Sequence, residues 1–254
     1  MAVSRVTSSF SLVRITRQPI LTKVRCSWLP YVVLKGKSGC VYASSVRTTR
    51  AGEESKISAM AIHTTNIEPH WNYLLALERS LDELSRYVEF HKRNFRCFSV
   101  EIARLLLACG AEVDVVCKQI CQAHNTASRA ETILQYRREI VSAFPGVTGF
   151  KVLLPNYGLT LRPWDEWRKT DGVPHWWTAY NKTKHQRQTE YHQANLKNML
   201  NAIAGLFVVV LYFYKDKAEN GKLAPPPRLL HVEPKHFVGF SEGINSSVFL
   251  YKLH

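Results

Sequence analysis

Apolar residues recur at helical spacing along the chain from about residue 66 onward. In the first such stretch they return every three or four residues while charged side chains cover the opposite face, which predicts a helix that ends near Lys92. Asn66 is a suitable N-cap for this helix, and Pro69 is tolerated in its first turn. The apolar positions are Trp71, Leu74, Leu75, Leu81, Leu84 and Val88.

The same periodicity predicts further helices. Ser99 begins one that ends near Ala123, and Glu101 lies in its first turn, where a carboxylate suits the helix dipole. The others are expected over residues 128–143, 175–189 and 191–217. The last contains the longest apolar run, thirteen residues from Ala202 to Tyr214. A membrane-spanning helix needs about 20 apolar residues, so this run predicts a buried helix and no membrane association.

Two regions favour β-structure. Residues 150–154 and 159–162 flank Pro155 to Gly158, which is typical of a small β-hairpin. Two or three short strands are expected after a break at residues 221–227. The predicted fold class is therefore mainly α: a bundle of four to five helices with a small β-hairpin insertion and a short β C-terminal tail. We expect the bundle to span residues 60–221 and a β-rich tail packed on it to span residues 222–254.

The first 59 residues differ from the rest. They hold ten Lys and Arg against two Glu, a net +8, whereas the other residues carry 24 − 18 = +6 of the total +14. This basic leader lacks sustained periodicity and is expected to lack order. It is consistent with a transit peptide, with a tail that contacts nucleic acid, or with a reading frame extended upstream of Met60; the start of organised sequence just after Met60 favours the last.

The cysteines argue against a disulfide framework. They are few, no pair has CxxC spacing, and four of the six lie in or near predicted helices, which fits reduced thiols in a cytoplasmic protein. Cys117, Cys121 and His124 share one helical face, but a structural zinc site needs four convergent ligands, so we expect buried thiols, no metal and no cofactor. The six are Cys26, Cys40, Cys97, Cys109, Cys117 and Cys121.

The densest polar cluster spans residues 180–187, Tyr-Asn-Lys-Thr-Lys-His-Gln-Arg. On a helix, Asn181, Lys184 and His185 lie near one face. Lys182, Lys184 and Arg187 form an anion site if they line a groove, and His185 is suited to general acid or base chemistry on a phosphodiester. The cluster also fits a solvated basic helix.

This region resembles the HEPN superfamily of helical-bundle domains, over about residues 71–217. The family motif is an Arg, usually followed by Asn, and then a His after four to six intervening residues on a late helix. Here Asn181 and His185 are in register, and Tyr180 stands where the Arg belongs. Residues 101–113 are similar in composition to an earlier helix of such domains. The resemblance implies metal-independent RNA cleavage across a homodimer. Lys184 or Arg187 would have to supply the missing cation, and neither is equivalent to the motif Arg.

Two neighbouring features bear on this site. Trp176 and Trp177 precede the cluster by one turn and, with Trp164 and Trp167, are suited either to stacking on RNA bases or to anchoring the core. Glu112 and Asp114 interrupt an apolar helix. They are expected to form an ion pair that fixes helix register, or to orient His185 if the fold brings them near Lys184 or Arg187.

The sequence therefore predicts an HEPN-like protein that binds RNA or another polyanion. It is a candidate metal-independent endoribonuclease of a defence or toxin–antitoxin type, in which His185, Asn181, Lys184 and Arg187 act on the phosphate. The alternative is a non-catalytic helical module that binds a partner protein or forms a homodimer. Nucleotide-binding and serine-hydrolase motifs such as GxGxxG, Walker A and GxSxG are missing from the sequence.

Overall fold

The computed structural model describes residues 67–242 and 247–254. The predicted leader and the predicted cap Asn66 lie outside them. The protein is mainly helical with two small antiparallel sheets, so the predicted fold class is confirmed. The helices are α1 (Pro69–Ser85), α2 (Val100–His124), α3 (Ile133–Ala143), α4 (His175–His185), α5 (Arg187–Glu190), α6 (Leu196–Phe213) and α7 (Lys215–Glu219).

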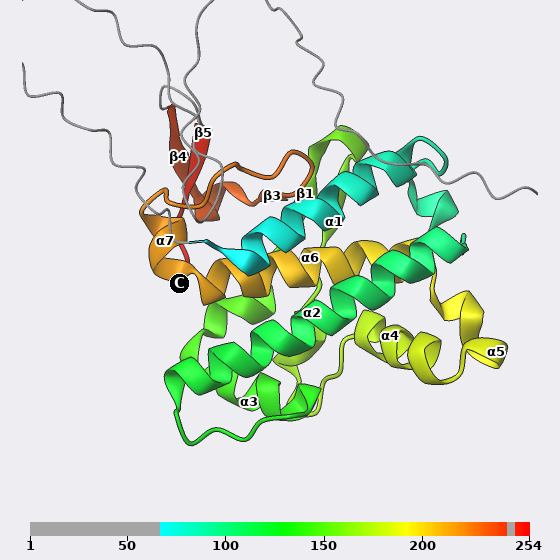
Figure 1. Ribbon diagram of the computed structural model, residues 1–254, viewed down its shortest axis with the longest axis horizontal. Helices are drawn as coiled ribbons and strands as arrows, with labels where there is room; N and C mark the ends of the chain where they lie inside the picture. Colours follow the sequence, from blue (N-terminus) through cyan, green and yellow to red (C-terminus); the bar gives the residue numbers. More distant parts are fainter. Residues whose placement is uncertain (1–66, 243–246) are drawn as a thin grey trace, which may run out of the picture. The chain divides into compact units, whose positions relative to one another are not determined.

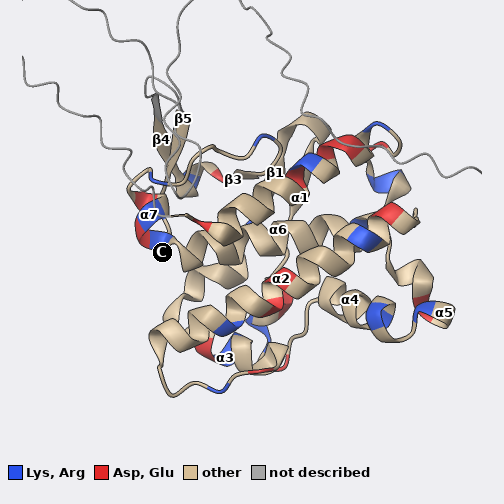
Figure 2. Cartoon of the chain, viewed as in Figure 1, with Lys and Arg blue, Asp and Glu red and all other residues tan. Residues whose placement is uncertain are grey.

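Helix α6 lies at the centre of the bundle. Fourteen of its 18 residues are buried, and α1, α2 and α4 all pack against it (Figure 1). Its only charged residue is Lys197, in the first turn, so α6 is drawn almost entirely in tan in Figure 2. Among the described helices α6 alone is long and apolar enough to cross a membrane, and the bundle buries most of it, as the sequence analysis predicted.

The strands form two separate sheets. β1 (Val152–Leu154) pairs with β2 (Leu159–Leu161) as the predicted hairpin, and β3 (His231–Val232) adds to the other edge of β1. β4 (Phe237–Glu242) and β5 (Ser247–Tyr251) form a separate antiparallel pair. The chain after residue 221 therefore pairs directly with the hairpin insertion. Short 3-10 helices, labelled η1 (Lys92–Asn94) to η6 (Pro234–His236), fill the connections.

Several helix ends differ from the predicted ones. α1 stops at Ser85, whose hydroxyl donates to the carbonyl of Asp82 at 2.6 Å, and the chain then turns so that Phe90 packs on Tyr157. α3 begins at Ile133 and not at residue 128. Thr132 and Gln135 form a capping box there, in which each side chain bonds the other residue's backbone.

The two predicted late helices are each divided. The helix predicted over residues 175–189 breaks at Gln186, whose backbone leaves the helical region, and α5 follows it. The helix predicted from Tyr191 begins at Leu196, where the Asn195 side chain accepts from the amide of Asn198 at 3.1 Å. α2, by contrast, matches its prediction, with Ser99 as the N-cap.

A buried carboxylate joins α1 to the segment before β3. Glu78 is 4% exposed and accepts backbone hydrogen bonds from Arg228, Leu229 and Leu230 at 3.0, 2.8 and 3.0 Å. Three N–H donors thus replace the water that the carboxylate loses on burial. The anchor fixes the path of the chain that leads from α7 back to the hairpin.

We expect Glu78→Ala to lower the free energy of unfolding by about 3 kcal/mol, because it leaves buried backbone donors without an acceptor. Chemical denaturation followed by circular dichroism measures the loss. Glu83→Ala, on the exposed face of the same helix, is the control and should change stability by no more than about 0.5 kcal/mol. Equal effects of the two variants would contradict the anchoring role of Glu78.

Candidate functional site: the two ends of helix α4

Helix α4 carries the sequence-predicted site residues and has two different faces. The buried face consists of Trp176, Trp177, Ala179, Tyr180 and Thr183. The opposite face carries Asn181 and Lys182, which are half-buried, and Lys184 and His185, which are exposed. The division follows from helical spacing, because α2 and α6 both pack on the inner face.

The two tryptophans belong to the core. Trp176 is 2% exposed, donates its indole N–H to the carbonyl of Pro163 at 2.7 Å, and meets Trp164 edge to face. Trp177 is 7% exposed and packs on Trp176 and Tyr180. Both rings are almost fully buried, although Trp176 borders one cavity and Trp177 two others, so their predicted nucleic-acid-binding role stays a prediction. Their alternative interpretation, as core anchors, fits this burial.

Tyr180 occupies a structural position. Its ring lies against Gly110 of α2, where an added Cβ would stand only 2.4 Å from the Tyr180 Cδ2 atom. The two helices approach this closely because Gly110 has no side chain. Tyr180 is 6% exposed, so the residue at the position of the HEPN motif Arg points into the contact between α2 and α4. No cation is presented to a ligand from this position.

The outer face of α4 lines a groove. A cavity of ≈ 360 Å³ lies between Lys184, Asn181, Asp114 and the start of α3 at Thr132. A second cavity of ≈ 300 Å³ lies beside His185 and Lys182 and shares Asn181 with the first. We call the two together the α4 groove. Three of the four residues predicted to act on a phosphate, Asn181, Lys184 and His185, thus border one continuous surface.

The cations at this surface differ in their partners. Lys182 forms an ion pair with Glu190 of α5 at 3.0 Å, and its hydrogen bond lowers the pKa of that carboxyl. Lys184 Nζ lies 5.7 Å from the centre of the Tyr180 ring, and the Arg187 guanidinium lies 5.0 Å from that of Tyr191. Both therefore rest on aromatic faces and are not neutralised by a carboxylate in the described part of the chain.

Arg187 lies outside the groove. It begins α5, beyond the break at Gln186, and lines neither cavity. Its guanidinium therefore extends the basic surface past the end of α4 and does not enter the groove beside Asn181. His185 is exposed and makes no hydrogen bond or ion pair with the residues described here. Asn181, Lys184 and His185 border the groove, Arg187 lies beyond it, and the four form no closed catalytic cluster.

The two acidic residues of α2 have separate roles. Glu112 lies away from the groove, where its Oε1 atom accepts from Nδ1 of the buried His70 at 2.6 Å. Asp114 borders the groove with Lys184, but its carboxylate is held by Lys118 at 2.9 Å and by the Tyr136 hydroxyl at 2.9 Å. Burial and this hydrogen bond raise the pKa of Tyr136. Neither Glu112 nor Asp114 contacts His185, so these contacts do not support the prediction that one of them orients its imidazole.

The described helical thiols are buried, as predicted. Cys109, Cys117 and Cys121 lie in the core stripe of α2, and burial raises the pKa of Cys121 to about 12. A thiol with such a pKa is neither a nucleophile nor a ready metal ligand at neutral pH. No group of three or more His, Cys, Asp or Glu converges as a metal site in residues 67–242 and 247–254.

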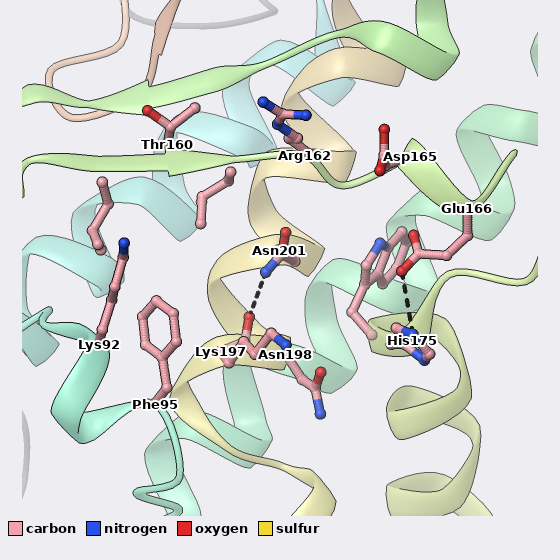
Figure 3. Close-up of a pocket in the computed structure, with 13 residues that line it drawn as sticks. Lys92, Phe95, Thr160, Arg162, Asp165, Glu166, His175, Lys197, Asn198 and Asn201 are labelled. Atoms are coloured by element: carbon pink, nitrogen blue, oxygen red, sulfur yellow. Dashed lines mark hydrogen bonds and ion pairs between the residues drawn. The ribbon is translucent and has the colours of Figure 1, made fainter. Parts of the chain in front are cut away.

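A further cavity, which sequence reasoning missed, lies at the other end of α4. It measures ≈ 280 Å³ and brings together Lys92 of η1, Arg162 just after β2 and Lys197 of α6 (Figure 3). His175 of α4 and Glu166 border it, with His175 Nε2 3.6 Å from Glu166 Oε1. We call it the β2–α6 pocket. Its cations come from three distant parts of the chain, so no local motif marks it.

Comparisons with known proteins give no match: no family model, no curated protein and no solved structure is similar to the chain.

We expect Gly110→Ala to lower the free energy of unfolding by about 1–3 kcal/mol, since the new methyl group would overlap the buried ring of Tyr180. Thermal unfolding followed by circular dichroism measures the effect. Gly239→Ala in β4 is the matched control, because an added Cβ there has no neighbour within 4 Å. A Gly110→Ala protein as stable as the control would show that α2 and α4 separate at little cost.

Proposed function

We propose that the protein binds RNA, or another polyanion, through the α4 groove and the basic surface that continues to Arg187. The observation that carries the proposal is the pair of cations at the end of α4: Lys184 and Arg187 rest on tyrosine rings without a carboxylate partner in the described residues. A phosphate backbone is attracted to such uncompensated charge. Asn181 and His185 add hydrogen-bonding groups beside it.

The resemblance to HEPN domains supports the same proposal, and it implies a homodimer that pairs two such surfaces. The observations favour binding over catalysis. In the family a cation acts together with the His, whereas Tyr180 is packed against Gly110 here and Arg187 lies beyond the groove. A metal-independent endoribonuclease of a defence or toxin–antitoxin type, acting through His185, is the second candidate, favoured by the exposure of that imidazole. A module that binds a partner protein, in the cytoplasm, is the third.

The double variant Lys184→Gln/Arg187→Gln should bind RNA more weakly, with a flatter dependence of affinity on salt. For single strands, every phosphate that the protein no longer neutralises removes about 0.7 from the slope of log K against log salt. Fluorescence anisotropy of a labelled mixed-sequence RNA, titrated with full-length protein at several salt concentrations, measures both quantities. Every variant is made in the full chain and keeps the basic leader, so the leader contributes equally to the RNA affinity of all the proteins compared.

The control for that experiment is Lys222→Gln/Lys252→Gln, which removes two exposed lysines elsewhere on the protein. It changes net charge by the same amount and should leave the slope unchanged if binding is localised at α4. Equal losses of affinity in both double variants would mean that RNA responds only to overall charge, and would overturn the assignment of the surface.

We expect wild-type protein to bind RNA without cutting it in the presence of EDTA, because the cation position of the motif is occupied by the buried Tyr180. Gel analysis of a labelled RNA tests this with the His185→Ala variant. His192→Ala, which removes another exposed imidazole, is the control. Cleavage by the wild type and by His192→Ala, but not by His185→Ala, would contradict the expectation and establish the ribonuclease. Neither binding nor cleavage would favour the protein-interaction module.

A further inference from the structure

The β2–α6 pocket has an unbalanced charge. Lys92, Arg162 and Lys197 are exposed around it, and none forms an ion pair within the described residues. Of the two acids at its border, Asp165 is paired with the Arg168 guanidinium at 2.9 Å, whereas Glu166 lies 3.6 Å from the exposed His175 ring. One carboxylate thus faces three cations. The pocket therefore has uncompensated positive charge, which favours an anionic ligand.

The position of Lys197 strengthens this conclusion. It lies in the first turn of α6, an 18-residue helix whose N-terminal end carries the positive pole of the helix dipole. A lysine at this end is modestly unfavourable, and a bound anion would offset that cost. The first-turn amides are satisfied within the protein: Leu196 donates to the Cys97 carbonyl at 2.8 Å and Lys197 to the Phe95 carbonyl at 3.2 Å. Side chains, rather than the helix amides, would therefore hold the anion.

The rest of the lining suits a planar polar group. Phe95 is half-buried, and Figure 3 shows its ring between Lys92 and Lys197 at the pocket. Asn201 donates its amide N–H to the Lys197 carbonyl at 2.9 Å, and Asn198 donates to the Gln193 carbonyl at 2.9 Å. Both amides therefore keep a carbonyl oxygen that can accept from a ligand N–H group. An aromatic face beside amide acceptors is a suitable environment for a nucleobase.

We propose that the β2–α6 pocket binds one phosphate-bearing nucleotide. The phosphate lies among Lys92, Arg162 and Lys197, and the base lies against Phe95 beside Asn198 and Asn201. The volume of ≈ 280 Å³ is near the lower end of small-molecule sites, which suits a single nucleotide and excludes a folded polymer. The nucleotide is either free or the 5′-phosphorylated end of an RNA. The site is distinct from the α4 groove, because the two share no lining residue.

Isothermal titration of the full-length protein with AMP, adenosine and inorganic phosphate tests the proposal. AMP should bind at least tenfold more tightly than adenosine. Arg162→Gln/Lys197→Gln should weaken AMP at least tenfold, while the Lys222→Gln/Lys252→Gln control leaves it unchanged. Phe95→Leu should weaken the binding of AMP and leave the affinity for inorganic phosphate unchanged. Circular dichroism melts establish that each variant is folded.

Three results would contradict the proposal. No measurable AMP binding, or equal binding of AMP and adenosine, overturns the proposal. If Arg162→Gln/Lys197→Gln leaves the AMP affinity unchanged, AMP does not bind in the β2–α6 pocket. If Phe95→Leu leaves the AMP affinity unchanged, the base makes no contact there, and the pocket binds a simple anion. These outcomes are independent of the α4 groove, since Lys184→Gln/Arg187→Gln should bind AMP like the wild type.

A second arm separates the two sources of the nucleotide. A short RNA with a 5′-phosphate is compared with the same RNA bearing a 5′-hydroxyl. A preference for the phosphorylated RNA that disappears in Arg162→Gln/Lys197→Gln identifies an RNA end as the ligand. Equal binding of the two RNAs, together with tight AMP binding, identifies a free nucleotide.

Discussion

The burial of one nearly uncharged helix is the constraint on which the rest of the structure depends. α6 exposes so little polar surface that it needs partners on every side, and α1, α2 and α4 supply them. Gly205 on α6 admits the Trp176 ring, to which an added Cβ would lie within 2.9 Å, and its carbonyl accepts from the Trp164 indole at 3.2 Å. Trp164 and Trp176 thus help to enclose this helix.

This packing determines which groups of α4 remain available to a ligand. A helix enclosed by α2 and α6 on one side offers mainly the other side, so Trp176, Trp177 and Tyr180 are largely buried and only the edges of their rings border the cavities. What remains is an outer face of amide, imidazole and ammonium groups at one end, and His175 beside a cationic cavity at the other. The polar groups of α4 that could contact a ligand therefore lie near its two ends.

Local signals predict most of the fold, and long-range contacts explain the differences. The helical periodicity and the Ser99 cap locate α2 almost to the residue, since both depend on neighbours three or four positions apart. The capping box at Thr132 is also a local signal, and it marks the start of α3 more accurately than periodicity does. The break at Gln186 has no Gly or Pro to announce it, and an ion pair between Lys182 and Glu190 spans it.

The candidate site is less predictable than the fold for the same physical reason. The contact of Gly110 with Tyr180 joins residues seventy positions apart, and no periodic pattern reports it. The sequence places Lys184 and His185 on one helix correctly, because helical spacing alone decides that. Which face of that helix is buried depends on α2 and α6, and the three cations of the β2–α6 pocket meet only after the hairpin and α6 have packed.

The order of elements along the chain has a consequence for synthesis on the ribosome. α1, α2 and α4 all precede α6 in the sequence, yet each packs part of its apolar face against it. During translation those faces emerge before the helix that shields them, and they stay exposed to other chains until residue 213 has left the exit tunnel. A ribosome that pauses between the codons for residues 124 and 196 would prolong this exposure, so the yield of folded protein should depend on the rate of elongation across that interval.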